Sequence, residues 1–83
     1  FDKVVRIITK RFNDILDNGH PQVRSTSLVL GSRVAAGYIS ESDARYLAES
    51  LIRQNSYLQK GLKGYLNTAS WAIGQGMNSP KYF

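Results

Sequence analysis

The chain has 83 residues, 42% of them hydrophobic, which suffices for one folded domain with a single core and excludes a disordered chain. It contains no cysteine, which excludes disulfides and thiolate metal sites and fits a reducing cytoplasm, and no apolar run approaches the roughly 20 residues of a membrane span. The net charge of +5 favours polyanionic partners, nucleic acid first, although small soluble domains without such partners also carry this excess.

The first helix is predicted over residues 1–17. On a helical wheel its apolar residues fall within about 120° of one another; they are Phe1, Val4, Val5, Ile8, Phe12, Ile15 and Leu16. The opposite face is basic and includes Arg6 and Lys10. This face either contacts phosphates or is solvated, with Lys10 paired to Asp14 one turn later.

A turn around residues 18–21 is predicted to separate the first two helices. Asn18-Gly19 ends the first helix, and Pro21 prevents its immediate continuation. His20 lies in this turn, and a single histidine without cysteine or a carboxylate cluster is a poor metal site. We therefore expect His20 to be an ordinary loop residue.

The second helix is predicted over residues 22–36. Its apolar residues spread around most of the wheel, which indicates burial on several sides; they are Leu28, Val29, Leu30, Val34, Ala35 and Ala36. Gly31 indicates a close crossing with another helix, and Gly37 is placed to end the helix in a left-handed conformation. Arg24 and Arg33 are the charged residues of this helix.

The third helix is predicted over residues 41–54. Ser40 and Asp43 fit a capping box, in which the Ser40 hydroxyl accepts a hydrogen bond from the Asp43 amide. Apolar residues then repeat at helical spacing: Ala44, Leu47, Ala48, Leu51 and Ile52. Glu49 is expected to pair with Arg45 and with Arg53, each four residues away.

The fourth helix is predicted to start between Tyr57 and Leu62 and to run to about Gly76. Its apolar stripe comprises Leu58, Leu62, Tyr65, Leu66, Ala69, Ala72 and Ile73. Trp71 points away from this stripe and shares its face with Lys60, Lys63, Asn67, Gly74 and Gln75. Either Trp71 packs against the first helix or the C-terminal tail, or it is offered to a partner, where it stacks a base while lysines hold phosphates.

Together these segments predict an all-α fold, a small four-helix bundle that is antiparallel or orthogonal. Residues 1–83 are expected to form a single helical domain, excised from a larger replication protein. No histidine–carboxylate pair, nucleophile with a base, or magnesium-binding acid motif is present. We therefore expect no catalytic residues, no metal site and no cofactor, and we do not expect this domain alone to be an enzyme.

A set of glycines, cap residues and apolar residues carries a resemblance to a known family. It comprises Leu30-Gly31, residues 34–41, Ala44, Asn55-Ser56-Tyr57, Thr68, Gly74, Gly76 and Pro80, with Thr68-Ala69 where the family has a Thr-Ile-like pair. In these residues the chain resembles the primase C-terminal domain, the helical module beside primase and primase-polymerase catalytic domains in plasmid, phage and mobile-element replication proteins.

The resemblance implies a non-catalytic, cytoplasmic DNA-binding domain that assists template or nucleotide binding next to a primase catalytic domain, in DNA replication. Its expected partners are single-stranded or template DNA and the adjacent primase domain, with no membrane. The candidate nucleic-acid contacts are Lys60, Lys63, Asn67 and Trp71, followed by Arg6, Lys10, Arg24 and Arg33. The cations would neutralise phosphates and Trp71 would stack a base.

Two other hypotheses remain open from the sequence. In the first, the domain is a protein-interaction or interdomain scaffold, in which Trp71 and Tyr46 dock onto a neighbouring domain and the positive charge is incidental. In the second, the turn around Gly37 belongs to a sequence-specific helix-turn-helix protein. The following helix exposes Glu49 and Tyr46 beside its arginines, which is a poor base-reading surface.

Overall fold

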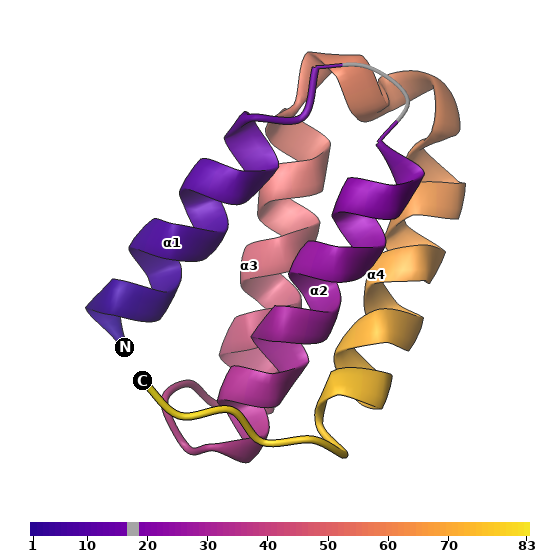
Figure 1. The fold of residues 1–83 in the computed structure, drawn as a ribbon. Coiled ribbons are helices and arrows are strands. Elements are labelled where there is room, and N and C mark those ends of the chain that lie inside the picture. Colours follow the sequence, from indigo (N-terminus) through magenta and orange to yellow (C-terminus); the bar gives the residue numbers. More distant parts are fainter. Residues whose placement is uncertain (17–18) are drawn as a thin grey trace.

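The computed structural model describes residues 1–16 and 19–83 and contains four α-helices and one short 3-10 helix. They are α1 (Asp2–Asn13), α2 (His20–Ala35), α3 (Glu41–Gln54), η1 (Ser56–Gly61) and α4 (Leu62–Gly76). Successive α-helices run up and down the bundle, so neighbours in sequence are antiparallel while α2 and α4 run in the same direction (Figure 1). With no strand in this part of the chain, the predicted all-α four-helix fold is confirmed.

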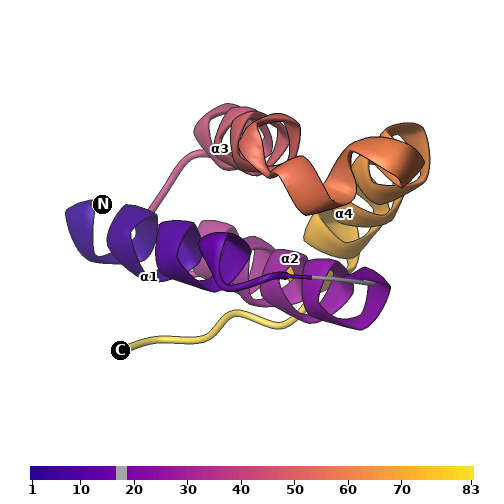
Figure 2. The same ribbon diagram turned by 90° about the horizontal axis from the view of Figure 1, so that it is seen from above.

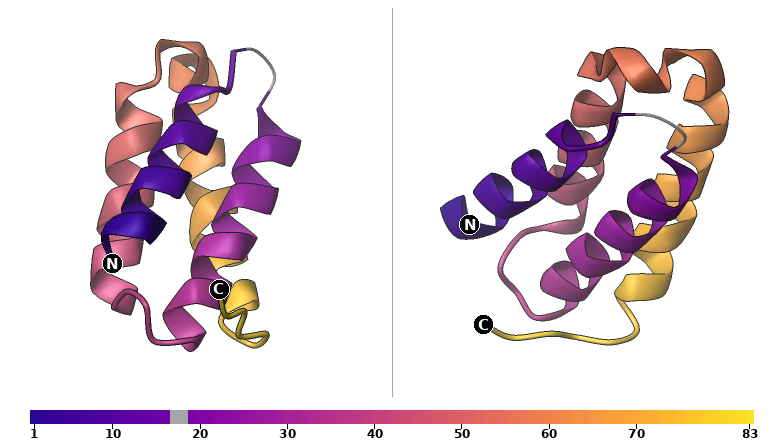
Figure 3. Two further views of the ribbon diagram at one scale, coloured as in Figure 1. Left: turned by 60° about the vertical axis from the view of Figure 1, so that its left-hand side comes forward. Right: turned by 45° about the horizontal axis from the view of Figure 1, so that its top comes forward.

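Seen from above, α1 and α2 lie side by side in one layer and α3 and α4 in the other (Figure 2). The short η1 crosses the top of the bundle between α3 and α4 (Figure 3). One core joins all five elements, and its largest fully buried side chains include Ile8, Phe12, Leu30, Ile52, Leu58 and Ile73. No helix among residues 1–16 and 19–83 is long and apolar enough to cross a membrane.

The most extensive helix–helix contact joins α2 and α4, and two glycines make it possible. A Cβ on Gly31 would collide with the Ile73 carbonyl, and one on Gly76 would collide with the Leu28 carbonyl. The Ser32 hydroxyl lies 3.1 Å from the Leu28 carbonyl oxygen of its own helix and 3.2 Å from the Gly76 carbonyl oxygen of α4, and its one proton is shared between these two acceptors. The predicted close crossing at Gly31 is therefore confirmed, and it brings the two backbones into direct contact.

Local hydrogen bonds end and begin the helices around α3. Gly37 has φ 88°, the left-handed conformation predicted for it. The Ser40 hydroxyl accepts from the Asp43 amide at 3.1 Å, which confirms the predicted cap and the start of α3. Beyond α3, Asn55 Nδ2 donates to the carbonyls of Phe12 and Ile15 at 3.0 Å each, so this one side chain ties the end of α1 to the α3–η1 junction.

Several sequence predictions about α1 and its neighbours are wrong. The first helix ends at Asn13, earlier than predicted, and Phe1 and Leu16, both predicted on its apolar face, lie outside the helix and are exposed. The second helix begins at His20, with Pro21 in its first turn, where the missing N–H has no helical partner to lose. The predicted stop at Asn18 lies outside the described residues.

Arg45 does not make the ion pair that its spacing suggested. Its Nε lies 2.9 Å from a Glu41 carboxylate oxygen, one turn before it, and Glu49 pairs only with Arg53, at 3.8 Å. The Arg45 guanidinium also donates to the Ser70 carbonyl and hydroxyl on α4. The hydrogen bonds to Ser70 therefore favour the orientation in which Arg45 pairs with Glu41 over the one in which it would pair with Glu49.

Candidate nucleic-acid interface

A groove of about 460 Å³ lies between the first turns of α2 and the middle of α4. It is lined by His20, Pro21, Arg24, Asn67, Thr68 and Trp71. Trp71 is 58% exposed and presents a large aromatic surface to solvent. This combination of an exposed indole, a guanidinium and a carboxamide in one concave surface is suited to a planar, polar ligand that carries negative charge.

Trp71 is exposed because nothing in the described structure covers it. The prediction that it might pack under the first helix is wrong, since α1 makes no contact with α4 within residues 1–16 and 19–83. The C-terminal tail does not cover it either, because Lys81 and Phe83 bind at the far end of α2, on Ser32 and Tyr38. The indole is therefore free to meet a ligand.

Lys63, Asn67 and Trp71 follow one another at intervals of four residues along α4. Each step advances about 6 Å along the helix and about 40° around it, so the three side chains form a continuous ridge beside the groove. Lys60 lies in η1, just before this ridge, and Lys60 and Lys63 are both exposed. The sequence-predicted first set of contacts thus lies along one edge of α4 and its preceding turn, and Arg24 joins it from α2.

The helices α2 and α4 begin at the same end of the bundle (Figure 1), and the groove extends from the first turn of α2 to the middle of α4. Neither helix has a side-chain cap or an acidic residue in its first turn. The His20 ring stacks on the Tyr65 ring, with centroids 4.3 Å apart, and this contact fastens the two helix starts together. Since a helix N-terminus carries partial positive charge, the start of α2, whose first turn lines the groove, makes this end of the groove attractive to anions.

The charge of the chain is segregated between its two halves. All six acidic residues lie within residues 1–17 and 41–49, so α2, η1 and α4 contain none. Residues 19–40 and 54–83 carry five cations and thus account for the whole net charge of +5: Arg24, Arg33, Lys60, Lys63 and Lys81. Among the described residues, no carboxylate pairs with any cation of the groove or of the ridge. The basic half and the aromatic groove therefore coincide.

The remaining predicted contacts are not brought to this groove. Arg6 and Lys10 lie on α1, and Lys10 pairs with Asp14 at 3.0 Å. Arg33 lies at the opposite end of α2 from Arg24, where its Nη1 donates to the Lys81 carbonyl. The structure thus separates the eight predicted residues into a groove set, an α1 pair and one arginine held by the tail.

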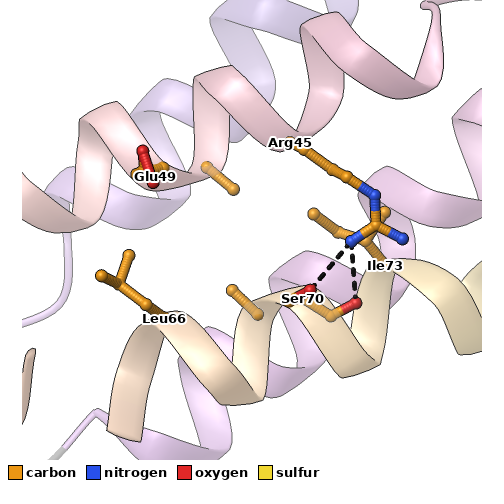
Figure 4. Close-up of a pocket in the computed structure, with 7 residues that line it drawn as sticks. Arg45, Glu49, Leu66, Ser70 and Ile73 are labelled. Carbon is orange, nitrogen blue, oxygen red and sulfur yellow. Dashed lines mark hydrogen bonds between the residues drawn. The ribbon is translucent and has the colours of Figure 1, made fainter. Parts of the chain in front are cut away.

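Besides the groove, a cleft between α3 and α4 and a hollow between α1 and α3 are smaller and less suited to a nucleic acid. The cleft between α3 and α4 measures about 130 Å³, below the roughly 300–1,000 Å³ of typical ligand sites. Figure 4 shows Arg45 reaching across it to Ser70, with Leu66 and Ile73 on the α4 side. The hollow between α1 and α3 has a volume of about 210 Å³, also below that range. It is lined by Phe1, Val5, Ile39, Asp43, Tyr46, Leu47 and Ser50.

Sequence reasoning did not predict three of the six groove residues, His20, Pro21 and Thr68, and His20 was missed because it was expected to lie in a loop. It is the first residue of α2, and its stacking partner Tyr65 is 45 residues away in sequence. The signal that points to it is the His20-Pro21 pair, since proline is favoured in the first turn of a helix. The described residues contain no group of three or more potential metal ligands, and His20 is not part of one.

The fold and the groove define a small all-α bundle with one basic, aromatic face. Comparisons of the chain with protein-family models, with curated proteins and with solved structures found no match. The resemblance to the primase C-terminal domain therefore stays a prediction, and it rests on the residues quoted above.

Proposed function

We propose that this domain binds single-stranded DNA through the α2–α4 groove and acts as a non-catalytic accessory module of a primase or related replication protein. The observation that carries the DNA-binding proposal is the 58% exposed Trp71 in a groove with Arg24, beside the first turn of α2. The primase context and the cytoplasmic location come from the resemblance of residues 30–80 and from the composition of the chain.

In this proposal each groove residue has a distinct role. The Trp71 indole stacks an unpaired base, a contact that tolerates any base because every base has an aromatic face. Arg24 and Lys63 flank the indole from α2 and α4 and neutralise phosphates on either side of the stacked nucleotide. Asn67 lies between Lys63 and Trp71 on the ridge and offers its carboxamide to the base edge or sugar. Paired bases hide their faces, so duplex DNA is expected to bind more weakly.

The test is a titration of an oligothymidylate into the domain, followed by the fluorescence of Trp71, which is the only tryptophan. We expect quenching that weakens as salt is raised. With phosphate contacts at Arg24, Lys60 and Lys63, the plot of log K against log salt should have a slope of about −2, since each contact to a single strand contributes about −0.7. Unchanged fluorescence at low salt would contradict the site.

Variants then separate a specific groove from a general effect of charge. Trp71→Ala should lower affinity about 5-fold to 150-fold, the loss expected for one stacked base, measured by the anisotropy of a labelled oligonucleotide. Lys63→Glu should also weaken binding clearly. Arg53→Glu is the matched control, because it makes the same charge change on α3, outside the basic half. Equal losses for the two charge reversals would mean that only net charge matters.

A second candidate function has one observation of its own. The hollow between α1 and α3 exposes Phe1 by 59% and Tyr46 by 74%, and a neighbouring catalytic domain would dock there. Trp71 lines the groove between α2 and α4 and Tyr46 lines the hollow between α1 and α3; the two hollows share no residue, so this docking surface uses Tyr46 without Trp71. Tyr46→Glu should abolish docking of a catalytic domain and leave oligonucleotide binding unchanged.

A further inference from the structure

After α4, the chain folds back over the C-terminal end of α2 and runs toward the start of α1 (Figures 1 and 2). Three hydrogen bonds hold it there. The Lys81 amide donates to the Ser32 carbonyl at 3.2 Å, the Arg33 Nη1 donates to the Lys81 carbonyl at 2.6 Å, and the Phe83 amide donates to the Tyr38 hydroxyl at 3.0 Å. These bonds place the Phe83 ring at one position between two helices.

The Phe83 ring is surrounded by cations. Its centroid lies 3.7 Å from the Arg33 guanidinium carbon of α2 and 4.3 Å from the Lys3 ammonium nitrogen of α1. The Tyr38 ring meets it edge to face at 4.8 Å. The ring is nevertheless 49% exposed, so it covers these groups without being buried by them. In the described part of the chain no carboxylate pairs with Arg33 or Lys3, so neither charge is neutralised by an acid; the partners of the Arg33 guanidinium are the Lys81 carbonyl and the rings of Phe83 and Tyr38.

We propose that Lys3, Arg33 and Tyr38 form a second site for an unpaired nucleotide, and that Phe83 occupies it until a base displaces the ring. A nucleotide suits the site better than a phenyl ring does, because it combines an aromatic base for the guanidinium with a phosphate for the ammonium group. This inference rests on the proposed binding of single-stranded DNA and adds a competing segment of the chain to it.

The second site is separate from the groove. Arg24 and Arg33 are nine residues apart on α2, which places them about 14 Å apart along the helix and about half a turn apart around it. A strand therefore reaches both only by passing around α2, and a short oligonucleotide occupies one at a time. The contribution of the second site should then appear with long oligonucleotides and fade with short ones.

The test compares Phe83→Ala with Tyr82→Ala in the full chain. Both changes remove an exposed aromatic ring of the tail and keep every charge, but the Tyr82 ring contacts no cation and lies 6.5 Å from the Tyr38 ring. Exposed cation–π contacts are weak. Removing the Phe83 ring frees the Lys3 and Arg33 cations, and each freed cation should tighten binding of a long oligothymidylate about 2-fold to 5-fold. The salt slope should steepen by about 0.7 for each added phosphate contact. Tyr82→Ala should match the wild type.

A second variant locates the gain. Arg33→Gln in the Phe83→Ala background should remove the part of the gain that Arg33 contributes, about 2-fold to 5-fold in affinity and about 0.7 in salt slope, with unchanged circular dichroism showing that the bundle stays folded. Affinity that is unchanged or weaker in Phe83→Ala, or a gain shared by Tyr82→Ala, would overturn the inference. Quenching of Trp71 in the wild type reports the groove independently. If wild-type quenching is present while Phe83→Ala has no effect on affinity, the second site is refuted and the groove proposal stands. If Phe83→Ala binds more tightly but the wild type shows no quenching, the groove proposal is refuted and the second site stands.

Discussion

Gly31→Ala is the change expected to damage the bundle most for its size. Gly31 lies in the middle of α2, where its Cα faces the backbone of α4. An added methyl group would collide with the carbonyl of Ile73 and would lie 3.0 Å from the Cα of Gly76. Both obstacles are backbone atoms, so no side chain can rotate away, and the two helices must move apart.

The expected loss follows from two terms. Alanine gains about 1 kcal/mol over glycine in a helix interior. Overpacking a core costs about 1–3 kcal/mol, and an obstacle made of backbone belongs at the upper end. The Ser32 hydroxyl adds little to the loss, because the Leu28 carbonyl of its own helix remains as an acceptor at 3.1 Å when Gly76 moves away. The net loss of unfolding free energy is about 2 kcal/mol, which lowers the melting temperature of a domain of this size by roughly 8–16 °C.

The assay is thermal and urea unfolding followed by far-ultraviolet circular dichroism, because the exposed Trp71 reports poorly on the core. Gly74→Ala is the matched control. It makes the same substitution inside α4, where the new methyl group would meet only the far end of the Arg45 side chain, at 3.8 Å. This control should gain up to about 1 kcal/mol. If Gly31→Ala were as stable as the wild type, the close backbone contact would not exist in solution.

Three further outcomes are expected. Ser40→Ala removes the cap of α3 and should cost about 1 kcal/mol in thermal unfolding, with Ser40→Thr recovering most of it. Asn55→Ala removes the donor to the Phe12 and Ile15 carbonyls and should cost about 2 kcal/mol in urea unfolding; Asn55→Asp also lacks that donor and should not rescue it. Trp71→Ala should change the unfolding free energy by no more than about 0.5 kcal/mol, so a large loss would mean that the indole is structural.

The parts of the fold that could be predicted are those specified by neighbours in sequence. Both ends of α3 follow from the Ser40 cap and from Asn55, and the turn before α3 follows from Gly37. These signals act over three or four residues, so a pattern in the sequence contains the whole interaction. The close crossing at Gly31 was predictable for a similar reason, since glycine inside an apolar helix has a local cost that packing must offset.

The parts that could not be predicted depend on contacts between distant segments. Arg45 has a glutamate four residues away on each side, and Ser70 of α4 selects the orientation in which Glu41 is its partner. Leu16 fits the apolar face of a longer first helix, but the helix stops at Asn13 and leaves it exposed. A helical wheel predicts which residues share a face only for residues that lie within the helix.

The candidate site also has a part that could be predicted from local sequence and a part that depends on packing between helices. The ridge of Lys63, Asn67 and Trp71 is a property of α4 alone, so periodicity was enough to find it. The addition of Arg24 depends on how α2 lies across α4, and that register is set by the contact of Gly31 with Gly76, two residues that are 45 positions apart in sequence.

The glycine crossing therefore controls both stability and the shape of the groove. The groove lies toward the starts of α2 and α4, and the crossing lies about two turns further along α2 from Arg24 to Gly31. Any separation of the helices at the crossing moves Arg24 away from Trp71, while the cations of η1 and the ridge on α4 keep their places. The charge of the site is thus a property of composition, whereas its concave shape is a property of packing, and base stacking beside a guanidinium requires both.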